Sequence, residues 1–159
     1  MNNYEKVNFN GIDVLLRVIN INTFFSLGKV PVTSVFCLPV KDNKIFLTLN
    51  PRGWDFIGGH IENNESPYDA MLREAMEEGA VKVFSSKILG IIEIFNPEWN
   101  ENSKYPETAY QIFYKTDNFK LQDFKADFEC MDCQFFDINK LNEIHHSLLE
   151  SHKKLIELI

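Results

Sequence analysis

Residues 58–81 read GGHIENNESPYDAMLREAMEEGAV, and this stretch constrains the fold more than any other part of the chain. Ser66 is a good helix N-cap, Pro67 suits the first helical position, and Asp69 completes a capping-box pattern. Gly79 is a plausible end of the same helix, because glycine is common where helices stop. The stretch therefore predicts a helix that begins after Ser66 and runs to about Gly79.

The predicted helix carries its acidic residues together. At roughly 100° per residue, Glu74, Glu77 and Glu78 fall within an arc of about 100°. The other side of the helix carries residues that can bury into a core: Tyr68, Met71, Leu72, Ala75 and Met76. The clustered carboxylates repel one another and oppose the helix dipole, at a cost of a few tenths to about 1 kcal/mol each. A divalent cation between the carboxylates would reverse this cost, which makes the cluster a candidate metal site. Taken alone, the helix is equally compatible with a charged face that is simply exposed to solvent.

The spacing around this helix resembles the Nudix box. That box is Gly, five residues, Glu, seven residues, Arg-Glu, an aliphatic residue, any residue, Glu-Glu, any residue, Gly and an aliphatic residue. Residues 59–81 match it at the first glycine and at every charged position: Gly59, Glu65, Arg73, Glu74, Glu77 and Glu78. The preceding Trp54 and Gly58 also look like the family's approach to the box.

The chain departs from the box pattern in two places. Ala80 replaces the final glycine, with Gly79 just before it, which favours a helix that ends one residue earlier than in the family. Ile57 precedes Gly58 where many members carry proline, and this should alter the strand slightly and the chemistry little. Neither departure removes a carboxylate.

The resemblance implies a metal-dependent, MutT-like hydrolase. It would cleave a diphosphate linkage in a nucleoside diphosphate derivative, such as a nucleoside triphosphate or an ADP-ribose-like substrate. The implied cofactor is Mg²⁺, with Mn²⁺ as the alternative, since Mg²⁺ prefers a few carboxylates together with water and phosphate oxygens. The ligands implied by the resemblance are the backbone carbonyl of Gly58 and the side chains of Glu74, Glu77 and Glu78. Glu65 and Arg73 look like the family's structural ion pair.

The general base is not fixed by the resemblance, because members use either a box glutamate or an acidic residue from a later loop. Glu129 is our candidate for the later residue, since it precedes the strand-like residues 133–136 at about the distance the family uses. Asp127, Glu98 and Glu107 are the alternatives. The predicted catalytic set is therefore Glu74, Glu77, Glu78 and Glu129.

Two other functions compete with hydrolysis. One is a catalytically weak Nudix-fold module that senses a nucleotide without cutting it. The intact set of box glutamates disfavours this, because degenerate sensors usually lose them. The other is an interaction protein with an acidic helix face, which gives no reason for the spacing of Gly59, Glu65 and Arg73.

The bulk composition fits a single-domain cytoplasmic protein. A length of 159 residues favours one domain over 1–159, with residues 1–30 as an extension that adds strands or supports a homodimer. The net charge of −7, without a basic patch, argues against a nucleic-acid partner. No apolar stretch approaches membrane-spanning length, and three cysteines are too few for a disulfide framework.

The order of the predicted elements gives the fold class. Strands are expected at 11–22, 31–40, 44–49, 54–57, 88–95, 108–116 and 131–137, followed by an amphipathic helix over about 138–159. This order predicts an α+β fold, an α/β/α sandwich around a mixed sheet like that of Nudix proteins.

Several aromatic and histidine residues lie outside the box. His145, His146 and His152 are expected on the surface of the terminal helix. The loop near 97–106 carries Trp99 and Tyr105, which either stack on a base or simply pack, and His60 could reach a substrate. The sequence assigns no residue to substrate binding.

Overall fold

The computed structural model describes residues 4–159. Within this range the strands are β1 (Glu5–Phe9), β2 (Ile12–Ile19), β3 (Val32–Lys41), β4 (Lys44–Asn50), β5 (Gly53–Asp55), β6 (Ile57–His60), β7 (Val81–Phe95), β8 (Thr108–Leu121) and β9 (Asp132–Asp137). The helices are α1 (Ile21–Ser26), α2 (Pro67–Gly79), α3 (Leu141–Ile144) and α4 (Glu150–Ile156), with a short 3-10 helix, η1 (Ile138–Lys140). None of the helices in the described range has the length and apolar composition needed to cross a bilayer.

The strands form one mixed sheet. Its main path is β1-β2-β7-β8-β3-β4-β5, with β6 beside β3 and β9 beside β4. The strands β3 and β8 run parallel, while the other named pairs are antiparallel. Because β3 pairs with both β8 and β6, it places the Gly58-Gly59 segment against the centre of the sheet.

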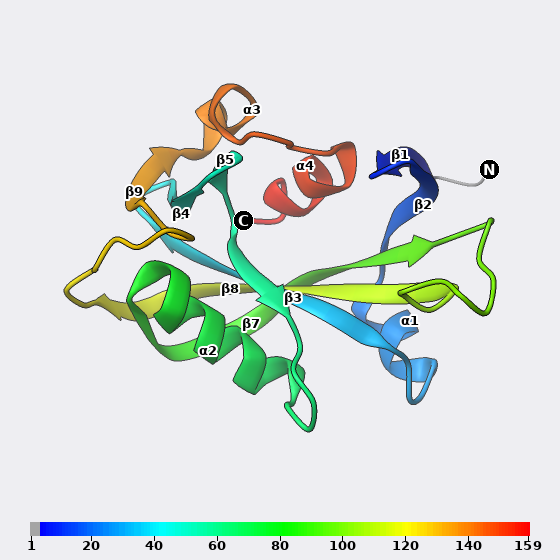
Figure 1. Ribbon diagram of the computed structural model, residues 1–159. Coiled ribbons are helices and arrows are strands. Elements are labelled where there is room, and N and C mark those ends of the chain that lie inside the picture. The colour runs from blue at the N-terminus through cyan, green and yellow to red at the C-terminus, as the bar shows by residue number, and fades with distance from the viewer. Residues whose placement is uncertain (1–3) are drawn as a thin grey trace.

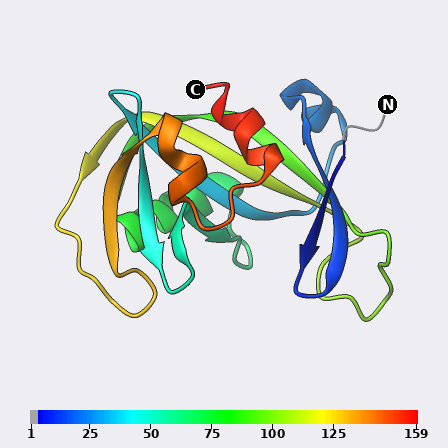
Figure 2. The same ribbon diagram turned by 90° about the horizontal axis from the view of Figure 1, so that it is seen from above.

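The sheet lies between two layers of helix (Figures 1 and 2). On one face α2 buries Met71 and Ala75, whereas Tyr68 and Met76, expected on the same buried side, are about 40% exposed. On the other face, Leu155 of α4 belongs to a second buried cluster together with Leu141 of α3. This layering confirms the predicted mixed sheet and α+β class.

The N-terminal segment joins the sheet. β1 and β2 form a hairpin, and β2 pairs with β7, so that residues 5–19 extend one edge of the sheet (Figure 2). The predicted strand 11–22 ends early because Asn20 caps a short helix, accepting a hydrogen bond from the backbone N–H of Asn22. Phe24 of this helix is buried and packs edge-on against Tyr110, with 5.4 Å between ring centroids.

Three further predicted strands have different bounds in the structure. The segment 54–57 is two strands, since β5 pairs with β4 whereas β6 pairs with β3. Strands β7 and β8 are longer than 88–95 and 108–116, because residues 81–85 pair with residues 118–121. This extension leads directly out of α2, so it fixes where that helix ends.

The helix α2 has the predicted bounds, but its terminating residue differs from the expectation. Ala80, rather than Gly79, adopts the left-handed conformation (φ 50°), and its backbone N–H donates to the carbonyl of Met76. The helix therefore does not stop one residue early. Gly79 serves close packing instead, because a Cβ at this position would collide with the buried side chain of Ile57.

Ala80→Gly is expected to stabilise the protein by about 0.5–1 kcal/mol. A Cβ is unfavourable in the left-handed region, and this gain outweighs the added freedom of glycine in the unfolded chain. Urea unfolding measures the change. Asn64→Gly is the matched control, because Asn64 also has a positive φ (65°) but asparagine tolerates that region better. A loss of stability in Ala80→Gly would contradict the prediction.

The C-terminal tail is not one continuous helix. Residues 145–149 interrupt it between α3 and α4, because His145 and His146 both turn toward Asp55 of β5. Their Nε2 atoms lie 3.0 Å and 2.8 Å from the two Asp55 oxygens, and the His146 backbone N–H donates to the carbonyl of Trp54. Neither histidine lies on a helix, contrary to the expectation, and His145 is buried, whereas His146 is exposed as expected.

His152 should make stability depend on pH. Burial lowers its pKa to about 4, helped by His145 and opposed by Asp55 and Glu5, whereas an unfolded histidine titrates near 6.5. Between these values only the unfolded chain binds the proton, so acidification from pH 6.5 to 4 lowers stability. The expected loss from this group is about 3 kcal/mol.

Urea unfolding across this pH range tests the assignment. His152→Leu should flatten the curve between pH 6.5 and 4, whereas His60→Leu, which changes an exposed histidine, should keep the slope. If the stability of His152→Leu fell with pH as steeply as that of the wild type, His152 would not be the cause of the pH dependence.

Candidate metal and active site

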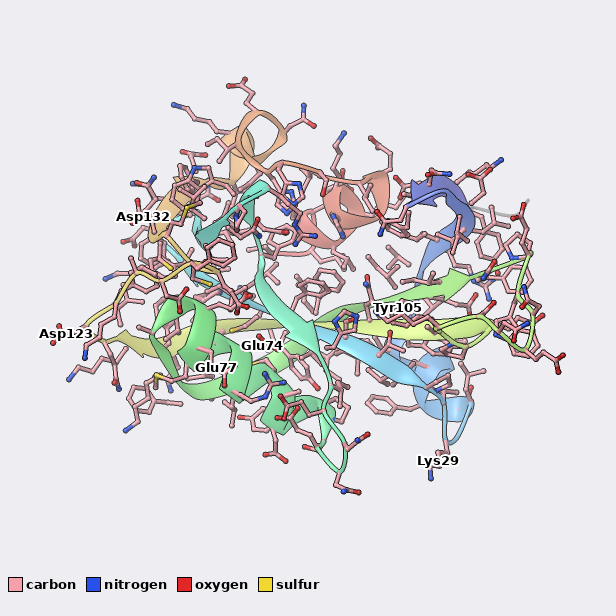
Figure 3. The ribbon with its side chains drawn as sticks, viewed as in Figure 1. Lys29, Glu74, Glu77, Tyr105, Asp123 and Asp132 are labelled. Atoms are coloured by element: carbon pink, nitrogen blue, oxygen red, sulfur yellow. The ribbon has the colours of Figure 1, made fainter. Side chains whose placement is uncertain are left out.

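The three acidic residues of α2 lie in different environments. Glu74 is only 8% exposed and lies against Gly59 of β6. The Oε2 atom of Glu78 accepts a hydrogen bond from the backbone N–H of Gly58 at 2.9 Å. The Glu77 side chain is 60% exposed, and Figure 3 shows it on the same helix as Glu74. Glu74 and Glu78 therefore face the glycine segment, while Glu77 lies at its rim.

Two glycines allow β6 to approach these carboxylates. A Cβ on Gly59 would collide with the carboxylate of Glu74, and a Cβ on Gly58 would collide with the carbonyl oxygen of Val35 in β3. Any larger residue at either position would push β6 away from the helix or from the sheet. Because neither glycine has a side chain, the backbone of β6 can lie directly against the carboxylates of α2.

Arg73 connects the parts of this cluster. Its Nε and Nη2 atoms donate to the two carboxylate oxygens of Glu65, at 2.9 Å and 3.0 Å. Its Nη1 atom donates to Glu74 at 2.8 Å and to Glu77 at 3.1 Å. Its Nη2 atom also donates to the carbonyl oxygen of His60 at 3.0 Å. One guanidinium therefore ties the helix to the loop before it and to the end of β6.

The cluster holds more negative charge than Arg73 balances. Burial raises the pKa of Glu78 to about 7, the nearby charges of Glu74, Asp55 and Glu129 add to the rise, and the Gly58 N–H opposes it. Burial also raises the pKa of Glu74, although Arg73 lowers it. Carboxylates with raised pKa values in a half-buried cluster are typical of a functional site.

The comparison with known proteins decides the family. The family model described as "NUDIX domain" matches residues 30–159. The chain belongs to the Nudix family. The segment before residue 30, which forms the β1–β2 hairpin and α1, lies outside the match.

Individual relatives show how far the similarity extends. An 8-oxo-dGTP diphosphatase from Proteus vulgaris is 34% identical over 58 residues, which are 33% of this chain and 52% of that protein. The chain thus matches about half the length of this curated relative. The MutT NUDIX hydrolase structure from Burkholderia pseudomallei has a TM-score of 0.61 and 16% identity, covering 82% of this chain and 99% of that one. The NUDIX domain of Shewanella oneidensis NrtR, complexed with ADP ribose, has a TM-score of 0.55 and 16% identity, covering 88% and 96%. At these identities the structures show the shared Nudix fold alone.

The donors in the Nudix box suit a hard divalent cation. In the described chain, no three His, Cys, Asp or Glu side chains are grouped closely enough to hold a metal ion as they stand. Carboxylate and carbonyl oxygens beside surplus negative charge are nevertheless the chemistry that Mg²⁺ requires, and it keeps several waters, so it needs only one or two carboxylates. Glu74 and Glu78 already face β6, whereas Glu77 would have to leave Arg73. Gly58 contacts the cluster through its N–H group.

Among the four candidates for a later acidic residue, Glu129 is the one whose charge acts on Glu78. It is exposed on the connection between β8 and β9, and its charge contributes to the raised pKa of Glu78. The carboxylate of Asp127 is engaged locally, since it accepts the backbone N–H groups of Glu129 and Cys130 at 2.8 Å and 2.7 Å. Glu98 and Glu107 lie instead at the ends of the β7–β8 connection, which holds Tyr105.

Asp55 was missed by the sequence analysis. Burial would raise its pKa, but contacts with His145 and His146 more than offset this and hold the pKa at about 2. Its charge therefore persists beside Glu78. The sequence around Asp55 gives little indication of its role, because the histidines that contact it lie 90 residues further along the chain.

The end of the Nudix helix is held by groups that no motif indicates. The carbonyl oxygen of Glu78 accepts hydrogen bonds from the Thr48 hydroxyl and from the Cys133 thiol, both at 3.1 Å. Burial raises the pKa of Cys133 to about 11, so this thiol stays protonated and able to donate. These contacts satisfy a terminal helix carbonyl and fix the position of Glu78.

Two cavities, of about 320 Å³ and 290 Å³, lie away from the carboxylate cluster, one between α3 and α4 and the other beside Phe119 and Phe135. Neither is lined by a residue of the Nudix box.

Proposed function

We propose that this Nudix protein hydrolyses a diphosphate linkage in a nucleoside diphosphate derivative. The observation that carries the proposal is a cluster of four carboxylates around one arginine, in which Arg73 contacts Glu65, Glu74 and Glu77 while Glu78 accepts the Gly58 N–H. Hydrolysis of a phosphoanhydride requires neutralised phosphate charge and a positioned water molecule. A bound Mg²⁺ or Mn²⁺ would supply that neutralisation and make the water more acidic.

The residues of the site would divide the remaining tasks. Glu74 and Glu78 would hold the cation beside the Gly58 carbonyl, and Glu77 would join them after leaving Arg73. Arg73 and Glu65 would keep the loop and helix in register through their two parallel hydrogen bonds. Glu129 would accept the proton of the attacking water on its carboxylate, because it is exposed and close enough to influence Glu78.

Nucleotides with two or more linked phosphates form the substrate class. One relative is named for 8-oxo-dGTP and another is complexed with ADP ribose, and both compounds contain a nucleoside diphosphate. We therefore propose this shared unit as what the site receives.

A nucleotide panel tests the proposal. Purified protein would be incubated with 8-oxo-dGTP, dGTP, ATP and ADP-ribose, with Mg²⁺, with Mn²⁺ or with EDTA, and the products separated by chromatography. We expect turnover of at least one compound with metal and its loss with EDTA. No metal-dependent turnover of any phosphoanhydride in a wider panel would overturn the assignment.

The ion pair between Arg73 and Glu77 favours a second candidate, a nucleotide-binding module with little turnover. In that case Glu77 would remain on Arg73 and the cation would lack one ligand. Tight nucleotide binding without turnover, even at high protein concentration, would support this function.

A further inference from the structure

We propose that Tyr105 and His60 form the surface on which the aromatic base of the nucleotide stacks. This inference rests on the proposed function, and it names the part of the site that recognises the substrate. Tyr105 is 43% exposed, and its ring lies nearly parallel to that of His60, with 12° between the planes and 5.8 Å between centroids. The Tyr105 hydroxyl lies 3.1 Å from His60 Nε2, so each ring orients the other.

The position of His60 connects this surface to the carboxylates. His60 follows Gly59, whose backbone lies against Glu74, and its carbonyl oxygen accepts a hydrogen bond from Arg73. Adjacent residues alternate sides along a strand, so the His60 side chain projects away from the face on which Gly59 meets Glu74. In Figure 3 Tyr105 lies near the middle of the view, whereas Lys29, Asp123 and Asp132 lie at the periphery. His60 is the last residue of β6, so a nucleotide with its phosphates at Glu74 would pass the end of this strand to place its base on the pair.

The loop that carries Tyr105 is held by its own hydrogen bonds. The Trp99 indole N–H donates to the carbonyl of Tyr105 at 3.1 Å, and the Asn96 N–H donates to the carbonyl of Glu107 at 2.8 Å. Tyr105 is thus exposed but positioned, which lowers the entropy cost of binding. An oriented, solvent-facing aromatic ring beside a phosphate site is the arrangement that binds a base by stacking.

A cation lies at the same place. The Lys104 Nζ atom lies 5.1 Å from the centroid of the Tyr105 ring. In a chain with a net charge of −7, this lysine would move off the ring when a base stacks there, and beside the ring its charge would attract the anionic nucleotide.

Binding of two probes tests the base contact apart from catalysis. The probes are α,β-methylene-ADP, which carries a base and resists hydrolysis, and methylenediphosphonate, which has no base. Titration calorimetry with Mg²⁺ would compare the full-length wild type with Tyr105→Ala. We expect about tenfold weaker binding of α,β-methylene-ADP, equivalent to 1.4 kcal/mol, and methylenediphosphonate binding within about twofold of the wild type.

Two further variants define the cause. Tyr105→Phe should retain most of the affinity, because the ring rather than the hydroxyl makes the stack, and His60→Ala should lose part of it. Tyr68→Ala is the matched control, because Tyr68 has nearly the same exposure (41%) but lies on the first turn of α2. It should bind both probes like the wild type.

The outcomes separate this inference from the proposed function. Equal effects of Tyr105→Ala on the two probes, no effect on either, or equal losses in Tyr105→Phe and Tyr105→Ala would each overturn the stacking surface. Base-dependent binding that is lost in Tyr105→Ala supports it, even if the wild type hydrolyses nothing. Hydrolysis by the wild type with unchanged binding in Tyr105→Ala would refute the stacking surface and leave the proposed function standing.

Discussion

Glu78→Gln should lower kcat by about 10²–10³-fold, the loss typical of removing one preorganised electrostatic group from an active site. The variant keeps the shape of the side chain and removes its charge. Without that charge, the cluster holds a divalent cation less well and the phosphates are less well neutralised. The measurement is steady-state turnover of the substrate found in the nucleotide panel, at saturating Mg²⁺.

A second measurement distinguishes this loss from misfolding. An amide oxygen at position 78 can still accept the Gly58 N–H, and a buried charge with a raised pKa is removed, so thermal stability should stay the same or increase. Glu143→Gln, an exposed change on α3, is the matched control and should leave both activity and stability unchanged. Turnover within threefold of the wild type in Glu78→Gln would remove Glu78 from the catalytic set.

The Nudix helix was predictable because its signals are local. Ser66 accepts the Asp69 N–H as the capping pattern indicates, and the apolar Met71 and Ala75 are buried as their spacing requires. The family spacing also placed Glu65 and Arg73 together, and they are hydrogen-bonded through two parallel contacts. Short-range patterns of this kind contain nearly all of the information that the helix needs.

The different orientations of the box glutamates could not be read from a helical wheel. The wheel gives angles about the axis, and it put Glu74, Glu77 and Glu78 within one arc. In the structure, β6 covers part of that arc, so Glu74 is buried and Glu78 half-buried, while Glu77 remains at the rim. That difference depends on Gly58 and Gly59, which let a strand approach the helix.

The prediction of one continuous helix over about 138–159 was wrong for a different reason. Its apolar spacing fits a helix, and α3 and α4 do bury Leu141 and Leu155. The break arises because Asp55 attracts His145 and His146 from far along the chain. A contact between positions 90 residues apart leaves no trace in local periodicity, and tertiary pairing overrides the helical preference.

Arg73→Ala is expected to lower the free energy of unfolding by about 3 kcal/mol in a chelating buffer. The substitution leaves Glu65 and the buried Glu74 without their charged partner, and hydrogen bonds to charged groups contribute about 1.5–3 kcal/mol each. Urea unfolding with EDTA measures the loss. Arg52→Ala is the matched control, because that arginine is 73% exposed and lies 3.5 Å from Asp55, so its removal should cost less than about 1 kcal/mol.

Added Mg²⁺ should restore part of the stability lost in Arg73→Ala, and stabilise this variant more than it stabilises the wild type. The guanidinium and the cation compete for the same carboxylates, and Glu77 in particular is free to bind metal only when Arg73 releases it. A ligand that binds only the folded chain raises stability with its concentration, so the difference between the two proteins reports this competition. Equal stabilisation of both by Mg²⁺ would mean that the cation does not share ligands with Arg73, and Glu77 would then have no place in the metal site.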